Sequence, residues 1–173
     1  GGRKLVEELE TTFNAEFGSN GNFFDVEVLQ DLTIKTFDVH ALTTGTGRVE
    51  VWYRPGSYAG NIGSNTGWTL VYEDDAVALQ GINSHTPLGD FNGGAGLPLA
   101  VGTHAFFVYI LDGNLYTGGT LEGNLYVQDD ALQIKEGNGV RSPGFGASPG
   151  DVFVPRVWNG VVYYVLGLPT DAP

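Results

Sequence analysis

The sequence predicts an all-β protein, an antiparallel two-sheet β-sandwich that is jelly-roll-like. Apolar and polar residues alternate along most of the chain, which is the period of a half-buried strand. Glycine is frequent, at 27 of 173 residues, and it clusters between the alternating runs, where tight turns need it. Because turn residues recur at short intervals, we expect roughly nine or ten short strands in one domain. A closed barrel is the alternative architecture.

The first half of the chain supplies five of these strands. Phe24, Val26 and Val28 alternate with acidic residues, and the apolar pattern of the next run breaks near Lys35 and Thr36, which allows a bulge there but does not require one. The acidic run 73–75 predicts a turn. The expected strands are 24–28, 32–42, 48–54, 68–72 and 76–79.

In the second half, residues 105–111 are apolar at every position, which is typical of a central strand covered on both faces. The near-copies Leu111–Tyr116 and Leu121–Tyr126 predict two successive turns of a meander. Asn159-Gly160 lies between two apolar runs, so we expect a final hairpin over 150–164. Further strands are expected at 97–101 and around Leu132 and Ile134.

The chain divides into an N-terminal arm, residues 1–10, and a single β-sandwich domain, residues 11–173. The arm carries Leu5, Val6 and Leu9, and the spacing of these apolar residues predicts either a turn of helix or an extended segment. Termini fray unless something holds them. An arm that pairs with the sheet edge of a neighbouring copy would hold this one, so the arm is a candidate assembly segment.

Composition excludes several classes of function. The net charge is −12, with eight Lys and Arg residues, so neither nucleic acid nor an anionic membrane surface is an expected partner. There is no Cys, which excludes disulfides, thiol catalysis and Cys-ligated zinc. No apolar run approaches the roughly 18 residues of a membrane span, so we expect no membrane insertion.

Several sequence blocks, taken in order, resemble one family. The blocks are Thr11–Phe13, Gly21–Val26, Ile34–Val39, Val49–Gly60, Gly67–Val71, Thr86–Leu88 and Pro155–Gly160. The chain resembles, over about residues 11–165, a β-sandwich module of large secreted or cell-surface proteins of environmental bacteria and microalgae. That family has no established activity. The resemblance implies an extracellular or cell-surface location and an adhesive, structural or binding role, while the arm is a departure from the family pattern.

Candidate catalytic groups do not form a recognisable set. His40, His85 and His104 lack metal-ligand spacing, and no Gly-x-Ser-x-Gly motif is present. The pairs Asp74-Asp75 and Asp129-Asp130 have the residue type that glycoside hydrolysis uses, but they lie where turns are expected. We therefore expect a protein that is not an enzyme.

A structural Ca²⁺ is the one cofactor that the sequence suggests. Extracellular jelly-roll modules hold such an ion with loop carboxylates and backbone carbonyls. The candidate ligands are Asp74, Asp75, Asp112, Asp129 and Asp130. The competing interpretation is that these residues are acidic turn residues that maintain solubility.

Two functions remain open. The first is a structural or adhesive protein that assembles with copies of itself, into a filament or surface layer, through the arm and the sheet edges. The alternative is a carbohydrate-binding module in which exposed aromatic rings stack on a polysaccharide. Its candidate residues are Trp52, Tyr58, Glu50 and Arg54. Trp68 and Trp158 are expected in the core or at sheet ends.

Overall fold

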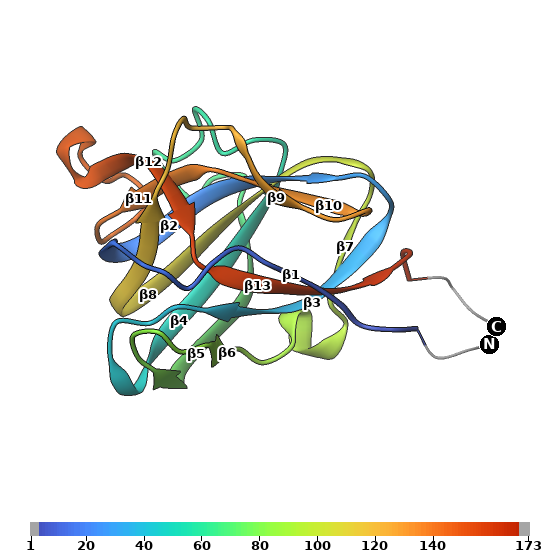
Figure 1. The fold of residues 1–173 in the computed structure, drawn as a ribbon, viewed down its shortest axis with the longest axis horizontal. Coiled ribbons are helices and arrows are strands. Elements are labelled where there is room, and N and C mark those ends of the chain that lie inside the picture. Colours follow the sequence, from blue (N-terminus) through green and yellow to red (C-terminus); the bar gives the residue numbers. More distant parts are fainter. Residues whose placement is uncertain (1–3, 170–173) are drawn as a thin grey trace.

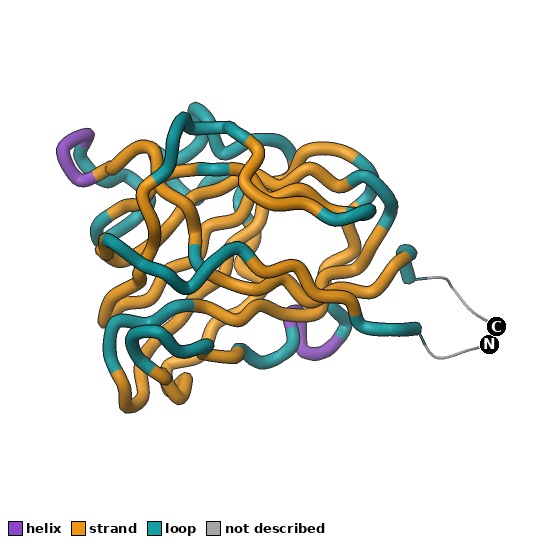
Figure 2. Tube along the Cα trace, viewed as in Figure 1, coloured by secondary structure: helices purple, strands orange, loops and turns teal. Residues whose placement is uncertain are grey.

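A computed structural model of the protein describes residues 4–169 and confirms the predicted all-β, jelly-roll-like sandwich of two antiparallel sheets (Figures 1 and 2). The smaller sheet contains, in spatial order, β1 (Glu7–Glu10), β13 (Gly160–Leu166), β3 (Leu32–Val39) and β6 (Thr86–Pro87), and β7 (Leu97–Leu99) also pairs with β3. The larger sheet contains β5 (Thr69–Gln80), β4 (Thr44–Pro55), β8 (Gly102–Gly118), β12 (Val152–Trp158), β11 (Gly137–Val140), β2 (Phe17–Val28), β10 (Leu132–Lys135) and β9 (Leu125–Gln128). Two 3-10 turns, Phe91–Gly94 and Pro149–Asp151, interrupt the strands. Neither is long and apolar enough to cross a membrane.

The main core lies between the two sheets and is built on aromatic rings. The rings of Phe24 and Trp158 stack with centroids 4.6 Å apart, and Phe37 lies 5.0 Å from the same Trp158 ring. All three side chains are fully buried. The expectation that Trp158 belongs to the core is confirmed.

A second apolar cluster covers the outer face of the larger sheet. Phe23 and Phe107 stack at 4.2 Å, and Trp68, Tyr58 and Phe145 pack around them from the loops over 55–68 and 141–150. Along β8, alternate residues therefore face different cores, which confirms the prediction of a strand covered on both faces.

The predicted hairpin at Asn159-Gly160 is wrong. β12 belongs to the larger sheet and β13 to the smaller one, so the chain crosses between sheets at this dipeptide. Asn159 is fully buried, and its amide donates to the Thr117 hydroxyl and to the carbonyl of Val157. The side chain therefore bonds inside the sandwich, instead of shaping an exposed turn.

Two other predicted turns lie inside strands. Asp112-Gly113 belongs to β8, and the acidic run 73–75 belongs to β5. Gly113 has a φ of +128°, which glycine tolerates, and the facing strand shifts register between Ser19 and Gly21, so an irregular strand replaces the turn. The turn at Gly123 is confirmed. A bulge is present at Lys35, one of the two positions where the sequence allows it, because Tyr163 pairs with Thr36 and Tyr164 with Ile34.

The C-terminal part of the arm is extended, so the helical interpretation of it is wrong. β1 pairs antiparallel with β13 of the same chain, from Glu7 opposite Tyr164 to Glu10 opposite Val161 (Figure 1). Leu9 is 7% exposed and belongs to the main core, whereas Leu5 and Val6 are exposed. The arm therefore covers the β13 edge of its own domain.

Four strands of the larger sheet pair in a closed cycle. β2 pairs with β8, β8 with β12, β12 with β11, and β11 again with β2. The rest of the sheet is open, so the closed-barrel alternative describes this one end of the protein. The side chains around the mouth of this cycle form the candidate site.

Candidate functional site

A shallow pocket of about 190 Å³ lies at the mouth of this strand cycle. β2, β8 and β12 contribute to its lining, together with the residue that follows β11. Ligand sites occur preferentially in such places, where side chains from several strands converge. The lining residues are Phe17, Gly18, Tyr116, Arg141, Phe153 and Arg156.

Arg156 is the central charged group of this pocket. Its guanidinium carbon lies 4.5 Å from the ring centroid of Phe17 and 5.9 Å from those of Tyr116 and Phe153. Nη1 donates a hydrogen bond of 2.8 Å to the Pro155 carbonyl, while Nε is buried and has no partner within residues 4–169. No carboxylate in that part of the chain forms an ion pair with Arg156, so the cation is held by aromatic faces and one backbone carbonyl.

The Tyr116 ring forms the inner wall of the pocket and is fixed from both sides. Its hydroxyl donates to the Ser19 hydroxyl at 2.8 Å, and a Cβ on Gly139 would lie 2.3 Å from its ring. Burial raises the pKa of the Tyr116 phenol, although the Ser19 hydrogen bond and the positive charges of Arg156 and Arg141 act in the opposite direction. The phenol therefore stays neutral at physiological pH.

Arg141 supplies a second positive charge at the rim. Its guanidinium carbon lies 5.1 Å from the Phe153 ring centroid, and Nη1 pairs with the Asp151 carboxylate at 3.1 Å. The Arg141 side chain is 60% exposed, so the pair is screened and its donors are accessible. Two of the eight Lys and Arg residues of this acidic chain thus meet at one small pocket.

Chemically, the pocket combines an aromatic face with cationic donors. Phe17 is 48% exposed beside the guanidinium, and its ring offers a flat apolar face. Aromatic faces bind the apolar faces of sugar rings and other planar groups, while guanidinium groups bind anionic oxygens. The pocket contains no paired carboxylates and no nucleophile beside a base.

The sugar site expected from the sequence is mostly closed. Tyr58 is 5% exposed and its hydroxyl donates to the Glu122 carboxylate, which contradicts the expectation of an exposed ring. Trp52 is partly buried, packs edge-on against Phe145 at 5.4 Å, and donates from Nε1 to Glu50 at 2.8 Å. These rings complete the outer cluster because the loops fold over them.

The other two residues of that expected site also have internal contacts. Glu50 accepts from Arg48 as well as from Trp52, and its side chain is 19% exposed. The Arg54 guanidinium lies 6.0 Å from the Trp68 ring centroid. Of the four residues expected to bind sugar, Trp52 and Glu50 bond to each other. Tyr58 donates to Glu122, and Arg54 donates to the Pro55 carbonyl.

The five aspartates expected to bind calcium do not converge. Asp74 and Asp75 lie on edge strand β5, where Asp75 pairs with Arg48 at 2.7 Å, and Asp112 lies on β8. Asp129 and Asp130 follow β9. Within residues 4–169 no group of three His, Cys, Asp or Glu side chains is placed to hold a metal ion, and calcium binding stays a prediction.

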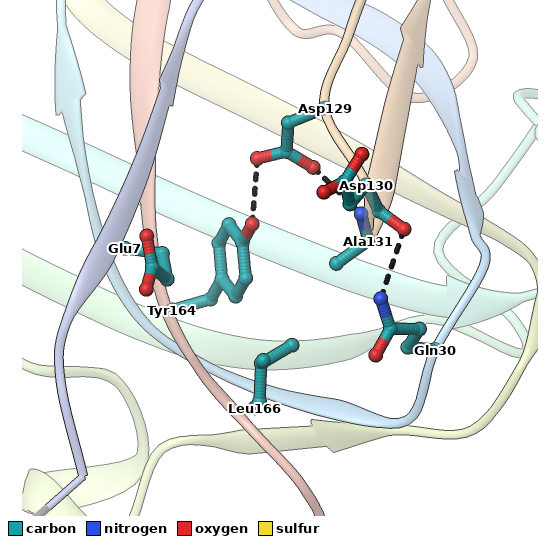
Figure 3. Close-up of a pocket in the computed structure, with 7 residues that line it drawn as sticks. All are labelled: Glu7, Gln30, Asp129, Asp130, Ala131, Tyr164 and Leu166. Atoms are coloured by element: carbon teal, nitrogen blue, oxygen red, sulfur yellow. Dashed lines mark hydrogen bonds between the residues drawn. The ribbon is translucent and has the colours of Figure 1, made fainter.

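Asp129 and Asp130 line a separate pocket, which Figure 3 shows. The Asp129 carboxylate accepts from the Tyr164 hydroxyl at 2.6 Å and from the backbone N–H groups of Ala131 and Leu132 at 2.9 Å each. It therefore caps the β9–β10 turn and joins it to β13. Hydrogen bonds within the fold account for this carboxylate, with no need for a metal ion.

The histidines each have a structural partner. His40 lies between Asn159 and the Asn83 backbone. His104 donates from Nε2 to the Ala100 carbonyl at 2.8 Å, and its Nδ1 forms a hydrogen bond of 2.7 Å with the Tyr53 hydroxyl. His85 contacts Asp38 at 3.0 Å and Glu10 at 3.3 Å, which ties the end of β1 to β3.

Comparison with known proteins finds the fold and no family. No family model and no curated protein sequence matches the chain. The structure of the clostridial cysteine protease Cwp84 after propeptide cleavage superposes with a TM-score of 0.53 at 12% identity, over 94% of this chain and 40% of that chain. A structure of the cysteine protease and lectin-like domains of Cwp84, a surface layer associated protein of Clostridium difficile, gives 0.52 at 13% identity, over 94% and 36%. This chain therefore spans well under half the length of these solved chains, and the likeness shows the fold alone.

Sequence reasoning missed the Arg156 pocket. Arg156 lies directly before the Val157-Trp158 pair, in a stretch where apolar and polar residues alternate. This alternation predicts a strand, but it does not indicate that Arg156 belongs to a binding site. The sequence does contain one indication of this site. The chain has eight Lys and Arg residues and twenty Asp and Glu residues, so a cationic residue with no acidic residue next to it in the sequence is a candidate for binding a ligand. The aromatic partners come from β2 and β8, far away in the sequence, so the cluster itself needed the fold.

Proposed function

We propose that this chain is a non-enzymatic module that works outside the cell and adheres to polysaccharide through the Arg156 pocket. The observation that carries the proposal is the half-exposed Phe17 ring beside the Arg156 guanidinium, at the mouth of the closed strand cycle. An exposed aromatic face with adjacent hydrogen-bond donors is the combination that binds sugar rings. This proposal moves the carbohydrate site expected from Trp52 and Tyr58 to another place in the fold.

The size of the pocket supports a polymeric ligand. At about 190 Å³, it is smaller than the roughly 300–1,000 Å³ that encloses a drug-sized molecule. It is open and shallow, so it suits one unit of a chain that continues over the surface. The extracellular location and the adhesive role rest on the family resemblance of the sequence, and the lectin-like domain of the Cwp84 structure is compatible with them.

Self-assembly into a filament or layer is the second candidate. The exposure of Leu5 and Val6 favours it, since two apolar side chains lie on the surface beside β1. Two of the sheet edges do not favour it. β1 presents Glu7, Glu8 and Glu10, and β5 presents the acidic run 73–75, and charged edge strands resist pairing with another chain.

Affinity electrophoresis in gels that contain one polysaccharide each, neutral or acidic, tests the proposed function. We expect at least one polysaccharide to retard the protein, and Phe17→Ala to abolish the retardation at an unchanged melting temperature. The matched control is Leu121→Ala, an exposed apolar residue in the β8–β9 connection, which we expect to bind normally. Equal retardation of wild type and Phe17→Ala would place the binding surface elsewhere.

A further inference from the structure

We infer that the polysaccharide is acidic, and that a carboxylate or sulfate of the bound sugar unit is held by the guanidinium of Arg156. This inference rests on the proposed function and specifies its ligand. The geometry behind it is a cation that the protein itself leaves without an anion. Neither the family resemblance nor the fold comparison points to this charge.

The charges around Arg156 favour an anionic ligand. In a chain with a net charge of −12, a cation finds an acidic neighbour easily, as Arg48 does with Glu50, Glu73 and Asp75. Arg141 has Asp151, whereas Arg156 has aromatic rings and one backbone carbonyl within the described part of the chain. Burying part of a guanidinium without an anion is costly, so the arrangement is one that a bound anion completes.

The hydrogen-bond donors of Arg156 favour the same kind of ligand. A guanidinium has five N–H donors. In residues 4–169, Arg156 donates from Nη1 to the Pro155 carbonyl, and it lies near enough to the Tyr116 hydroxyl to act against the rise in its pKa, while its buried Nε is unpaired. A carboxylate or sulfate oxygen that accepts from this side chain would form a charge-assisted bond, which is about twice as strong as a neutral one.

The aromatic rings around Arg156 favour a ligand that carries a sugar ring. Phe17, Tyr116 and Phe153 surround the guanidinium and hold its plane in position, so little side-chain entropy is lost on binding. Phe17 remains 48% exposed beside it. A sugar ring that lies on Phe17 brings a ring substituent within reach of Arg156, and Arg141 adds a second cation at the rim. A uronic acid or a sulfated sugar has both parts in one unit.

An acidic peptide shares the anion but lacks the flat, hydroxyl-bearing ring. The exposed Phe17 face therefore favours the acidic sugar over the peptide. Polyglutamate serves as the probe for the peptide alternative, because it matches the charge and has no sugar ring.

Isothermal titration with four polymers tests the inference: polygalacturonate, dextran sulfate, neutral dextran and polyglutamate. The titrations use about 0.15 M salt, where a Debye length of about 8 Å screens the negative charge of the whole protein. We expect polygalacturonate, dextran sulfate or both to bind, and dextran and polyglutamate not to bind. Which acidic polymer binds distinguishes the carboxylate from the sulfate.

The variants separate the inference from the proposed function. Arg156→Gln is expected to lower the affinity for the acidic polysaccharide about tenfold or more, and Arg156→Lys, which keeps the charge without the planar donors, to lower it less. Arg141→Gln, at a mainly exposed position, tests the same charge with little risk to folding. The control is Lys35→Gln, which removes one positive charge from β3 in the other sheet and is expected to bind as wild type does.

Each outcome is decisive. Binding of neutral polysaccharide that depends on Phe17 but not on Arg156 overturns the acidic-sugar inference and keeps the proposed function. Equal binding of polyglutamate and polygalacturonate overturns it in favour of an acidic peptide. No binding of any polysaccharide overturns the proposed function together with the inference.

Discussion

The Nδ1 atom of His40 lies 3.0 Å from the side-chain oxygen of Asn159, and both residues are fully buried. His40 directly follows β3 of the smaller sheet, and Asn159 is the residue at which the chain crosses from β12 to β13. Nε2 of His40 accepts from the Asn83 backbone N–H at 2.9 Å, so Nδ1 carries the proton and donates it to Asn159. This neutral imidazole ties the crossing point to the loop that follows β5.

We predict that His40 makes the protein less stable as the pH decreases. Burial, and to a smaller extent the nearby His85, lower the pKa of His40, against the opposing effect of the Asn159 hydrogen bond. An unfolded histidine titrates near about 6.5, so below that pH the unfolded state binds a proton that the folded state does not. The free energy of unfolding should therefore decrease as the pH falls from about 6.5 toward the lower pKa of the folded state.

Urea denaturation between pH 7.5 and pH 5.5 measures this effect. His40→Asn should be less stable than wild type at pH 7.5, because it loses a packed ring and two hydrogen bonds. The difference between the two proteins should narrow at pH 5.5. A difference that stays constant over this range would assign the pH dependence to groups other than His40. Asp25 is not such a group, because burial raises the pKa of its carboxyl and this stabilises the folded state as the pH falls.

The strands were predictable wherever the alternation of apolar and polar residues matches the burial of their side chains. Alternation located the strands, and the apolar run at 105–111 predicted correctly that β8 is covered on both faces. The wrongly predicted turns have one physical cause. Residue types that are common in turns, such as Asn and Gly, also occur at sheet crossings and inside irregular strands of a sandwich. Asn159 bonds internally at a sheet crossing, and Gly113 takes a positive φ within a long strand. Sequence alone does not distinguish these uses from a hairpin.

The candidate site was less predictable, because it depends on strand order. Trp52 and Tyr58 suggested exposed rings, but the loops over 55–68 and 141–150 fold back over that face. Phe17, Tyr116 and Arg156 meet because β2, β8 and β12 pair in a cycle, which no local pattern encodes. Side-chain types could be selected from the sequence, whereas their convergence required the structure.

We predict that Gly139→Ala destabilises the wall of the pocket. A Cβ at this position would lie 2.3 Å from the Tyr116 ring, and the residue is paired on both sides, with Asn22 and with Phe153. The backbone has little room to move, so we expect a loss of about 1–3 kcal/mol, as for other overpacked cores. Thermal and urea unfolding measure it.

The control for that change is Gly150→Ala, where an added Cβ meets no atom within 4 Å. It should leave stability unchanged to within about 0.5 kcal/mol. Adding Tyr116→Leu to Gly139→Ala should restore part of the loss, because the clash is with the ring. A loss at Gly139 that Tyr116→Leu does not relieve would locate the strain in the backbone.

We predict that Trp52→Ala reduces stability without changing polysaccharide binding. The ring packs against Phe145, and its N–H donates to Glu50, so its removal should cost about 2–3 kcal/mol, somewhat less than for a fully buried tryptophan. Trp52→Phe retains most of the packing and should lose less. Titration with the polysaccharide that binds wild type, below the melting temperature of each variant, gives the second measurement. A tenfold loss of affinity in both variants would restore the Trp52 site expected from the sequence.

We predict that deletion of residues 1–10 increases self-association. The deletion removes β1 and exposes the edge of β13 from Val161 to Tyr164, an apolar strand that is a template for pairing with another chain. It also removes three glutamates from that edge and the packing of Leu9. Light scattering after size exclusion, and electron microscopy at physiological salt, measure the result.

The matched variant for this deletion is Leu5→Ser with Val6→Ser, which removes the exposed apolar side chains and retains β1. If β1 protects its own sheet, the full-length protein is monomeric, the double variant stays monomeric, and only the deletion associates. If the arm is an assembly segment, the full-length protein forms filaments or layers, and both variants lose them. The two models therefore predict opposite changes on deletion, because the same strand either covers an edge within one chain or joins two chains.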